Sequence, residues 1–307
     1  MKKQVLALAI TAVASASAFA EVENSIYGSL RLKLTTGDSA ADISNDLSRI
    51  GLKGSSDTDF DGVKAIYRFE AGVGGGDTVR GDASNEANLN SRLAWVGLTS
   101  EDYGTLKVGQ IWTNYYSFVG GVTDVAISLT NDTQPYFRAD STVAYVSPEL
   151  SGFTFSAAVT SDTEQTTGGE GEADRYLVTA SYSNGAFGVN LGMVEEGLET
   201  LEDTLGLSVT YTADALYLAA LVQTKESDVD GADSRTPFEL AGTYSFDDKN
   251  ALAINYYDQD DEVETGYVIE FTSKIGAMST VYANIDTAMY DGGDDTTDYT
   301  VGLKVDF

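Results

Sequence analysis

Residues 298–307 read DYTVGLKVDF, and apolar and polar side chains alternate strictly along this stretch. The residues of one parity are apolar or aromatic: Tyr299, Val301, Leu303, Val305 and Phe307. The residues between them are Thr300, Gly302, Lys304 and Asp306. Because successive side chains of a β-strand point to opposite faces, this period of two predicts a strand with one apolar face and one polar face.

The same alternation recurs along most of the chain. SIYGSLRLKL at 25–34 and GVKAIYRFEAGV at 62–73 are two clear cases. Segments of roughly eight to twelve residues with this period are typical of β-strands. We predict sixteen strands, at 25–34, 46–55, 62–73, 88–99, 104–111, 139–147, 152–161, 174–183, 186–196, 204–212, 215–225, 236–245, 250–258, 264–272, 277–286 and 298–307.

The connections between the predicted strands are of two kinds. After even-numbered strands they are short, as in SNGA at 183–186 and FDDKN at 246–250. After odd-numbered strands most are longer and acidic, as in GGGDTVRGDASNEA from Gly74 and TAMYDGGDDTTD from Thr287. This alternation is the layout of a transmembrane β-barrel, with tight turns on one side and long loops on the other.

Alternation alone fits two architectures. In a β-sandwich the polar face meets water, whereas in a large barrel the apolar face meets lipid and the polar face lines a wet lumen. Strands of about ten residues suit a tilted crossing of a bilayer. Sixteen strands without helical cover also leave closure as the obvious way to remove exposed sheet edges. The predicted fold is therefore all-β, a 16-stranded antiparallel transmembrane β-barrel.

The first twenty residues, MKKQVLALAITAVASASAFA, differ from the rest of the chain. Lys2 and Lys3 precede a short apolar run that closes on Ala18-Phe19-Ala20. This order predicts a signal peptide at 1–20, because the apolar run is too short and too rich in small residues for a membrane anchor. Residues 21–307 are then expected to form a single barrel domain.

Composition excludes several classes of function. The 307 residues include 48 Asp and Glu against 18 Lys and Arg, a formal net charge of −30, and neither histidine nor cysteine. Nucleic-acid binding needs a basic footprint, so we expect no nucleic-acid partner. Without histidine the chain cannot carry serine–histidine or histidine–zinc chemistry. We expect no enzyme activity, no cofactor and no metal site.

Several stretches resemble the general porins of the Gram-negative bacterial outer membrane. They are SIYGSLRLKL at 25–34, SRIGLKGSSD at 48–57, YRFEAGV at 67–73, NSRLAWVGLTSEDYGTLKVGQ at 90–110 and RADSTVAYVSP at 138–148. The resemblance implies an outer-membrane protein with short periplasmic turns, long extracellular loops, a third loop folded into the lumen, and a homotrimer. Its further expected partners are outer-membrane lipid, lipopolysaccharide and the barrel-assembly machinery.

The terminal strand has a meaning in the family that this chain resembles. A final alternating strand ending in Phe is read there by the assembly machinery and pairs with the first strand. The resemblance thus assigns Phe307, with Tyr299, to the assembly signal and to barrel closure. A simpler interpretation is that Phe307 is a lipid-facing aromatic of the membrane interface, and both can hold.

Basic residues gather in the first five predicted strands. A Lys or Arg facing mid-bilayer lipid costs roughly 2–4 kcal/mol, so we expect these side chains in the lumen. In SRLAWVGL both parities are partly apolar, and placing Arg92 inward predicts that Leu93 and Trp95 face outward. With one later arginine, the expected basic wall of the pore comprises Arg31, Lys33, Arg49, Lys53, Arg68, Arg92, Lys107 and Arg138.

The longest connection, IWTNYYSFVGGVTDVAISLTNDTQPYF at 111–137, is more apolar than the other loops. We expect it to pack inside the barrel, and its acids are Asp124 and Asp132. The resemblance implies that carboxylates of this loop face Arg49, Arg92 and Arg138 across a constriction, with Asp124 the best candidate. Two plainer interpretations stay open, namely structural salt bridges for the arginines and a helix cap for Asp124.

These features predict a general diffusion channel for ions and small hydrophilic solutes. Opposed fixed charges across a narrow aqueous pore set a transverse field that favours small polar solutes. A substrate-specific channel is the other candidate, and we expect it less because the lumen parity offers few aromatics beyond Tyr27. The acidic outer loops fit divalent ions bridging to lipopolysaccharide, or simply a solvated surface.

Overall fold

The structure, a computed structural model, describes residues 23–38, 41–74, 89–127, 133–162, 173–197, 202–227, 233–260 and 264–307. The predicted signal peptide at 1–20 lies outside these residues. The described strands form one antiparallel sheet. They are β1 (Glu23–Gly37), β2 (Asp42–Asn45), β3 (Arg49–Asp57), β4 (Lys64–Val73), β5 (Leu89–Ser100), β6 (Gly104–Trp112), β7 (Arg138–Val146), β8 (Phe153–Asp162), β9 (Ala173–Ser183), β10 (Phe187–Glu195), β11 (Glu202–Ala213), β12 (Leu216–Ser227), β13 (Phe238–Ser245), β14 (Asn250–Asp258), β15 (Glu264–Lys274), β16 (Ser279–Tyr290) and β17 (Thr296–Asp306).

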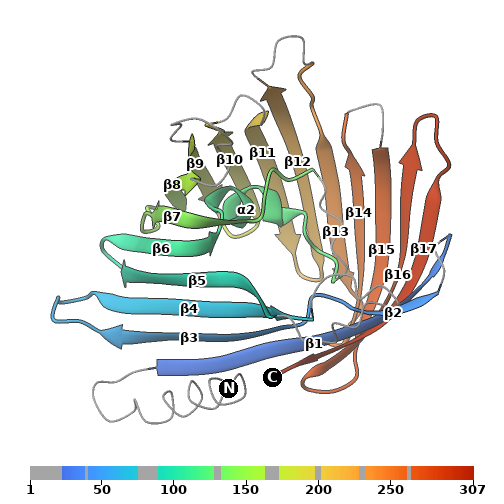
Figure 1. Ribbon diagram of the computed structural model, residues 1–307, viewed down its shortest axis with the longest axis horizontal. Helices are drawn as coiled ribbons and strands as arrows, with labels where there is room; N and C mark the ends of the chain where they lie inside the picture. Colours follow the sequence, from blue (N-terminus) through green and yellow to red (C-terminus); the bar gives the residue numbers. More distant parts are fainter. Residues whose placement is uncertain are drawn as a thin grey trace.

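The sheet closes on itself (Figure 1). From β3 onward each strand pairs with the next along the chain, and β17 returns to β1 with Leu303 opposite Leu32. At the other edge of β1, β3 pairs with its first half and β2 with its second half. β2 and β3 therefore occupy successive parts of a single strand position in the barrel. The seventeen segments thus make a closed barrel of sixteen strands, and the predicted fold is confirmed.

The predicted strand at 46–55 is interrupted in the structure. Leu47 has a φ of 59°, and the ladder breaks between β2 and β3. Ser48 repairs the break, because its Oγ accepts from the Arg31 N–H at 2.8 Å and donates to the Arg31 carbonyl at 3.1 Å. A side chain thus satisfies the backbone groups that the ladder leaves open.

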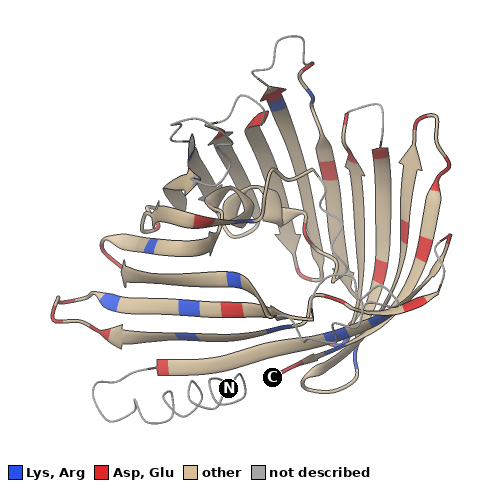
Figure 2. Ribbon diagram, in the orientation of Figure 1, with Lys and Arg blue, Asp and Glu red and all other residues tan. Residues whose placement is uncertain are grey.

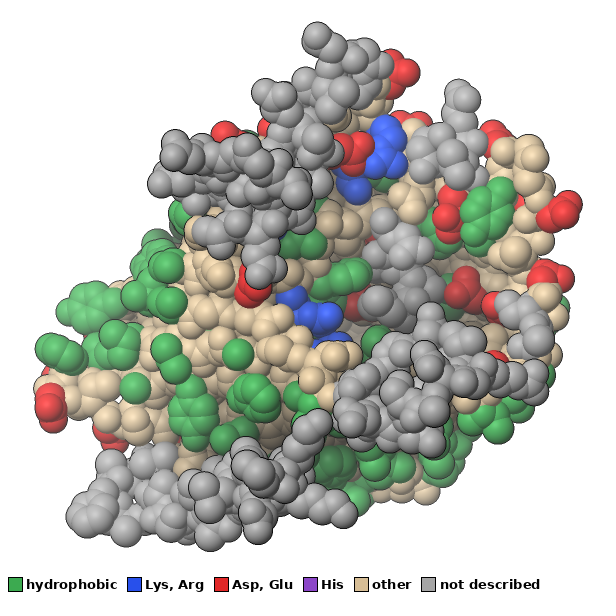
Figure 3. All heavy atoms as spheres, in the orientation of Figure 1, with side chains coloured by type: hydrophobic (Ala, Val, Ile, Leu, Met, Phe, Trp, Pro, Cys, Tyr) green, Lys and Arg blue, Asp and Glu red, His purple; other side chains and the backbone are tan. Residues whose placement is uncertain are grey.

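The two faces of the sheet separate as the alternation predicts. In β1, Leu30 and Leu32 are 52% and 59% exposed on the outside, whereas Arg31 between them is buried on the inside. The space-filling view shows hydrophobic side chains gathered over the outer surface of the strands (Figure 3). These side chains form the lipid-facing band of a transmembrane barrel. No helix in the described part of the chain is long and apolar enough to cross a bilayer.

The orientation expected for Leu93 and Trp95 is wrong. The β4–β5 pairing has a bulge, in which Glu70 faces Leu93 and Ala71 faces Ser91. Arg92 is the extra residue of the bulge, so Arg92 and Leu93 are both buried. Beyond the bulge the parity is reversed. Trp95 packs inside against the core, while Val96 is 63% exposed on the outside.

Residues 113–127 and 133–137, here called the inner segment, lie within the ring of strands (Figure 1). It contains α2 (Asn114–Phe118) and η2 (Gly120–Val122), which contact the inner side of β8 to β12. The hydrophobic core is the interface between this segment and the wall, made of Ile111, Tyr115, Val119, Ala144, Ala158, Leu177, Val194 and Leu221. Tyr115 approaches β11 so closely that a Cβ on Gly206 would lie 1.9 Å from its hydroxyl oxygen.

Candidate functional site

Four arginines from four strands line one cavity of about 310 Å³ in the lumen. Arg31 comes from β1, Arg49 from β3, Arg92 from β5 and Arg138 from β7. Asp124, just after η2, lines the same cavity. The pairing of β1, β3, β4, β5, β6 and β7 around the wall brings together arginines that lie far apart in the sequence.

An aromatic pair connects the arginines to Asp124. The guanidinium carbons of Arg138 and Arg92 lie 4.8 and 5.8 Å from the centroid of the Trp112 ring. Trp112 stacks on Tyr116 with the ring centroids 4.9 Å apart, and the Tyr116 hydroxyl donates to the Asp124 carboxylate. Because an aromatic face attracts cations, Trp112 lets two like charges lie side by side.

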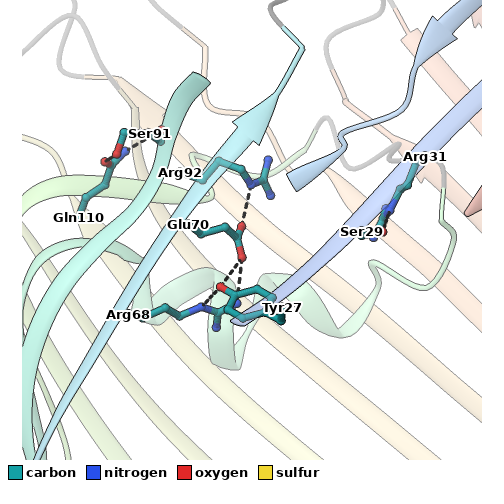
Figure 4. Close-up of polar contacts among 8 residues, drawn as sticks. All are labelled: Tyr27, Ser29, Arg31, Arg68, Glu70, Ser91, Arg92 and Gln110. Carbon is teal, nitrogen blue, oxygen red and sulfur yellow. Dashed lines mark hydrogen bonds and ion pairs between the residues drawn. The ribbon is translucent and has the colours of Figure 1, made fainter. Parts of the chain in front are cut away.

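Glu70 is a second carboxylate of this region, and Figure 4 shows its bonds. It accepts from Arg92 Nε at 2.8 Å, Arg68 Nη2 at 3.0 Å and the Tyr27 hydroxyl at 2.8 Å. Its side chain is only 1% exposed. We did not predict a role for Glu70, although the rule that placed Arg68 in the lumen applies equally to an acid of the same parity.

The plainer interpretation of a structural salt bridge holds for Arg92. Within the described residues, no carboxylate lies within 4.0 Å of Arg31, Arg49 or Arg138. Arg31 is oriented instead by the Ser29 hydroxyl, which its Nε reaches at 3.0 Å. Three guanidinium groups therefore keep their charge available to the lumen.

Asp124 faces these arginines from the inner segment. Burial raises the pKa of its carboxyl, against the opposing effects of the Tyr116 hydroxyl and of the charges of Arg49 and Arg31. Burial and the neighbouring carboxylate also raise the pKa of Tyr116, so the shared proton stays on the phenol. Asp124 does not cap α2. The N-cap is Thr113, whose Oγ1 accepts from the Tyr116 N–H at 3.1 Å.

The other predicted basic residues lie outside the arginine cavity. Lys33 pairs with the buried Asp46 at 3.4 Å. Lys53 and Arg68 lie over the Tyr27 ring, at 5.6 and 5.1 Å from its centroid. The Lys107 ammonium is 5.1 Å from the centroid of the Trp95 ring.

Two further expectations concern the lumen. Trp95 and Trp112 both line lumen cavities, so the expectation of few inward aromatics beyond Tyr27 is wrong. Asp132 falls outside the described residues.

Two glutamates that sequence reasoning missed hold the inner segment. Glu239 of β13 is fully buried and accepts from the hydroxyls of Thr123 and Thr133 and from Gln134 Nε2 at 3.3 Å. Glu270 of β15 is also fully buried and accepts from the Ile127 N–H at 2.6 Å. Both glutamates lie on the inward-facing parity of their strands. This parity is the feature of the sequence from which their position in the lumen could have been predicted.

Strand β1 meets the last residue of the chain where the barrel closes. The Phe307 N–H donates to the Gly28 carbonyl at 3.0 Å, and the Gly28 N–H donates to the Phe307 carbonyl at 2.8 Å. The Phe307 ring lies over Gly28, where a Cβ would come within 2.3 Å of it. Phe307 and Tyr299 are 51% and 53% exposed, so both stand on the outer face.

A closed antiparallel barrel with an apolar outer band and a charged, cavity-lined interior defines a transmembrane channel of the outer-membrane type. The Gram-negative porin family matches residues 7–306, and this chain belongs to that family. It is a passive channel of the outer membrane, and its family consists of channels rather than enzymes.

A curated relative agrees with this assignment, and solved structures share the fold. Outer membrane porin protein 32 of Delftia acidovorans is 26% identical over 272 residues, which cover 79% of this chain and 75% of that one. The anion-selective porin from Comamonas acidovorans has the same fold, with a TM-score of 0.73 at 19% identity over 94% of this chain and all of that one. Salmonella typhi OmpF, solved with daunomycin, has a TM-score of 0.75 at 18% identity over 92% of this chain and 97% of that one.

Proposed function

We propose that the cavity of Arg31, Arg49, Arg92 and Arg138 is the constriction of a general diffusion pore for ions and small hydrophilic solutes. Asp124 is its facing acid. The arginines lie on the barrel wall and Asp124 lies on the segment folded inside it, so a solute passing between them meets a transverse field. Small dipolar solutes align with such a field, whereas large or apolar ones are retarded.

The charge balance of the constriction favours anions. Four guanidinium groups line the cavity with Asp124, and Glu70 is already engaged by Arg92 and Arg68. The observation that carries the proposal is that Arg31, Arg49 and Arg138 lack a carboxylate partner within the described residues. Their field is therefore not neutralised at the proposed constriction, although the whole chain is strongly acidic.

Single-channel recording in a planar bilayer under a salt gradient tests this function. We expect large ohmic steps and a reversal potential of the sign that anion preference gives. A cation-selective reversal potential would overturn the proposed role of the arginine cluster. Correctly folded protein that gives no conductance would overturn the diffusion-pore function itself.

A substrate-specific channel is the second candidate. The observation that favours it is the presence of Trp95 and Trp112 in the lumen beside basic side chains. A specific channel binds its solute, so its current saturates with solute concentration, whereas that of a simple pore rises in proportion.

Membership of the family supports the remaining proposals, and the order of residues 1–20 supports the signal peptide. We infer a homotrimer embedded in outer-membrane lipid and lipopolysaccharide, with residues 1–20 removed as a signal peptide. We also infer that Phe307 and Tyr299 serve recognition by the barrel-assembly machinery, and that the histidine-free chain has no catalytic activity. Mass measurement in detergent tests the trimer, and Phe307→Ala, with Phe246→Ala as the matched control, tests assembly by the yield of folded barrel in membranes.

A further inference from the structure

A second lumen cavity lies between α2 and the strands β4 to β7. It has a volume of about 230 Å³, and its wall includes Arg68, Trp95, Lys107, Trp112, Asn114 and Phe118. Trp112 also lines the arginine cavity, and Trp95 and Arg68 also line a third cavity toward Lys53. The second cavity is thus a side pocket next to the proposed constriction.

The polar groups of this pocket suit an anion. Among the described residues that line it there are two cations, Arg68 and Lys107, and no carboxylate. Arg68 contacts Glu70, but no carboxylate of the described residues lies within 4.0 Å of the Lys107 ammonium. Lys107 is held beside the face of Trp95 instead. A half-buried cation without a counter-ion favours a bound anion.

Asn114 supplies an independent indication. It is 4% exposed, and its Nδ2 donor has no hydrogen-bond partner. A buried donor without a partner costs about 1–3 kcal/mol, so such groups are normally satisfied by water or a ligand. Because Asn114 lines this pocket, its orphan donor, together with Lys107, would suit the two oxygens of a carboxylate.

The apolar groups of the pocket set the shape of the rest of the ligand. Trp95, Trp112 and Phe118 contribute aromatic surface, which stacks favourably with a planar ring. The volume falls below the range of about 300–1,000 Å³ that drug-sized ligands occupy, so the pocket suits a molecule of one ring.

We propose that this pocket binds small planar organic anions, namely one-ring aromatic carboxylates, beside the constriction of the pore. The inference rests on the proposed channel function and names a preferred solute class for it. Lys107 and Asn114 bind the carboxylate, and Trp95 and Trp112 bind the ring. Such a site would concentrate these anions next to the arginine cluster of the proposed constriction, through which they then permeate.

Benzoate is the probe, with acetate matching its charge without the ring and benzamide matching its ring without the charge. The chain has two tryptophans, and both line the pocket. Intrinsic tryptophan fluorescence of the folded barrel in detergent therefore reports binding directly. We expect a saturable change with benzoate and none with acetate or benzamide, and a saturable reduction of single-channel current by benzoate alone.

Variants separate a specific pocket from general attraction of anions. Lys107→Gln should weaken apparent benzoate binding about tenfold, as the loss of a charge-assisted hydrogen bond predicts. Asn114→Leu should weaken it in the same direction. Lys64→Gln is the matched control, because Lys64 lies near a turn, pairs with Asp57 at 3.9 Å and does not line the pocket.

The outcomes distinguish this inference from the channel function. Normal conductance with no saturable benzoate signal overturns the pocket and leaves the channel in place. Equal effects of Lys107→Gln and Lys64→Gln overturn it too, since the binding would then be diffuse electrostatic attraction. If the folded wild-type protein shows no conductance, the result contradicts the channel function instead.

Discussion

Two walls of the barrel carry opposite charge, and they use it differently (Figure 2). The basic wall consists of the inward cations of β1 and β3 to β7. The acidic wall consists of Glu239 of β13 and Glu270 of β15. Arg31, Arg49 and Arg138 of the basic wall line a cavity of the lumen, whereas Glu239 and Glu270 bind the inner segment.

The difference lies in what covers each wall. The inner segment leans on β8 to β12 and reaches Glu239 and Glu270 through its hydroxyls, an amide and a backbone N–H. The acidic wall therefore holds the segment in place, and the basic wall is left facing the lumen. The proposed anion preference of the pore rests on this difference between the two walls.

The largest expected effect comes from breaking the acidic wall. Glu239→Leu removes the carboxylate that accepts from three donors of the inner segment, and each lost hydrogen bond costs up to about 1–3 kcal/mol. We expect a noisy open-channel current, higher conductance and a lower melting temperature. Glu101→Leu in an exposed turn is the control, and a quiet, unchanged current in Glu239→Leu would show that other contacts hold the segment.

Neutralising the basic wall should change selectivity without loosening the structure. Arg49→Gln with Arg138→Gln removes two unpaired charges from the cavity. At about 1 kcal/mol per charge near a permeating ion, the anion-to-cation permeability ratio should fall at least about fivefold. Reversal potentials measure the ratio, with Lys64→Gln as the control. A ratio that does not move would place the narrowest point elsewhere.

The bulge at Arg92 can be tested with single cysteines, because the chain has none of its own. Trp95→Cys should react with a charged, water-soluble thiol reagent and lose conductance, since this position lines the lumen. Val96→Cys, on the lipid face, should stay unreactive. The reverse pattern of reactivity would contradict the bulge and support the register that simple alternation predicts.

The smallest expected effect is that of pH on Asp124. Burial holds the pKa of this carboxyl above its ordinary value, so it takes up a proton as the pH falls through that raised pKa. Protonation removes a negative charge from the cavity and should increase anion preference, by no more than about fivefold. It also favours the folded state, because the pKa is higher there than in the unfolded chain.

Reversal potentials recorded over a pH series check this prediction. Asp124→Asn should behave at every pH as the wild-type protein does at low pH. If the variant retains the full pH dependence, another group carries the titration.

The candidate site shows where sequence reasoning succeeds and stops. Alternation, with the high cost of a charge in lipid, places Arg31, Arg49 and Arg138 inside the barrel, and they lie together in one cavity. The same rule also puts Lys53 and Lys107 inside, but it gives no height along the pore. The position of a side chain along the pore axis depends on the strand register, which the pairing of neighbouring strands fixes. Lys53 and Lys107 therefore line neighbouring cavities.

The sequence by itself determined the closed barrel and which face of most strands meets lipid. The period of two predicts strands with one apolar face. An open sheet edge would leave unpaired backbone groups, which are too costly in a bilayer, so the strands must close into a barrel. Tertiary structure alone decided the bulge that turns Trp95 inward, and the anchoring of the inner segment to Glu239, over a hundred residues later in the chain. Those contacts form only when the closed barrel brings strands that are distant in the sequence around one lumen. A local sequence pattern therefore cannot reveal them.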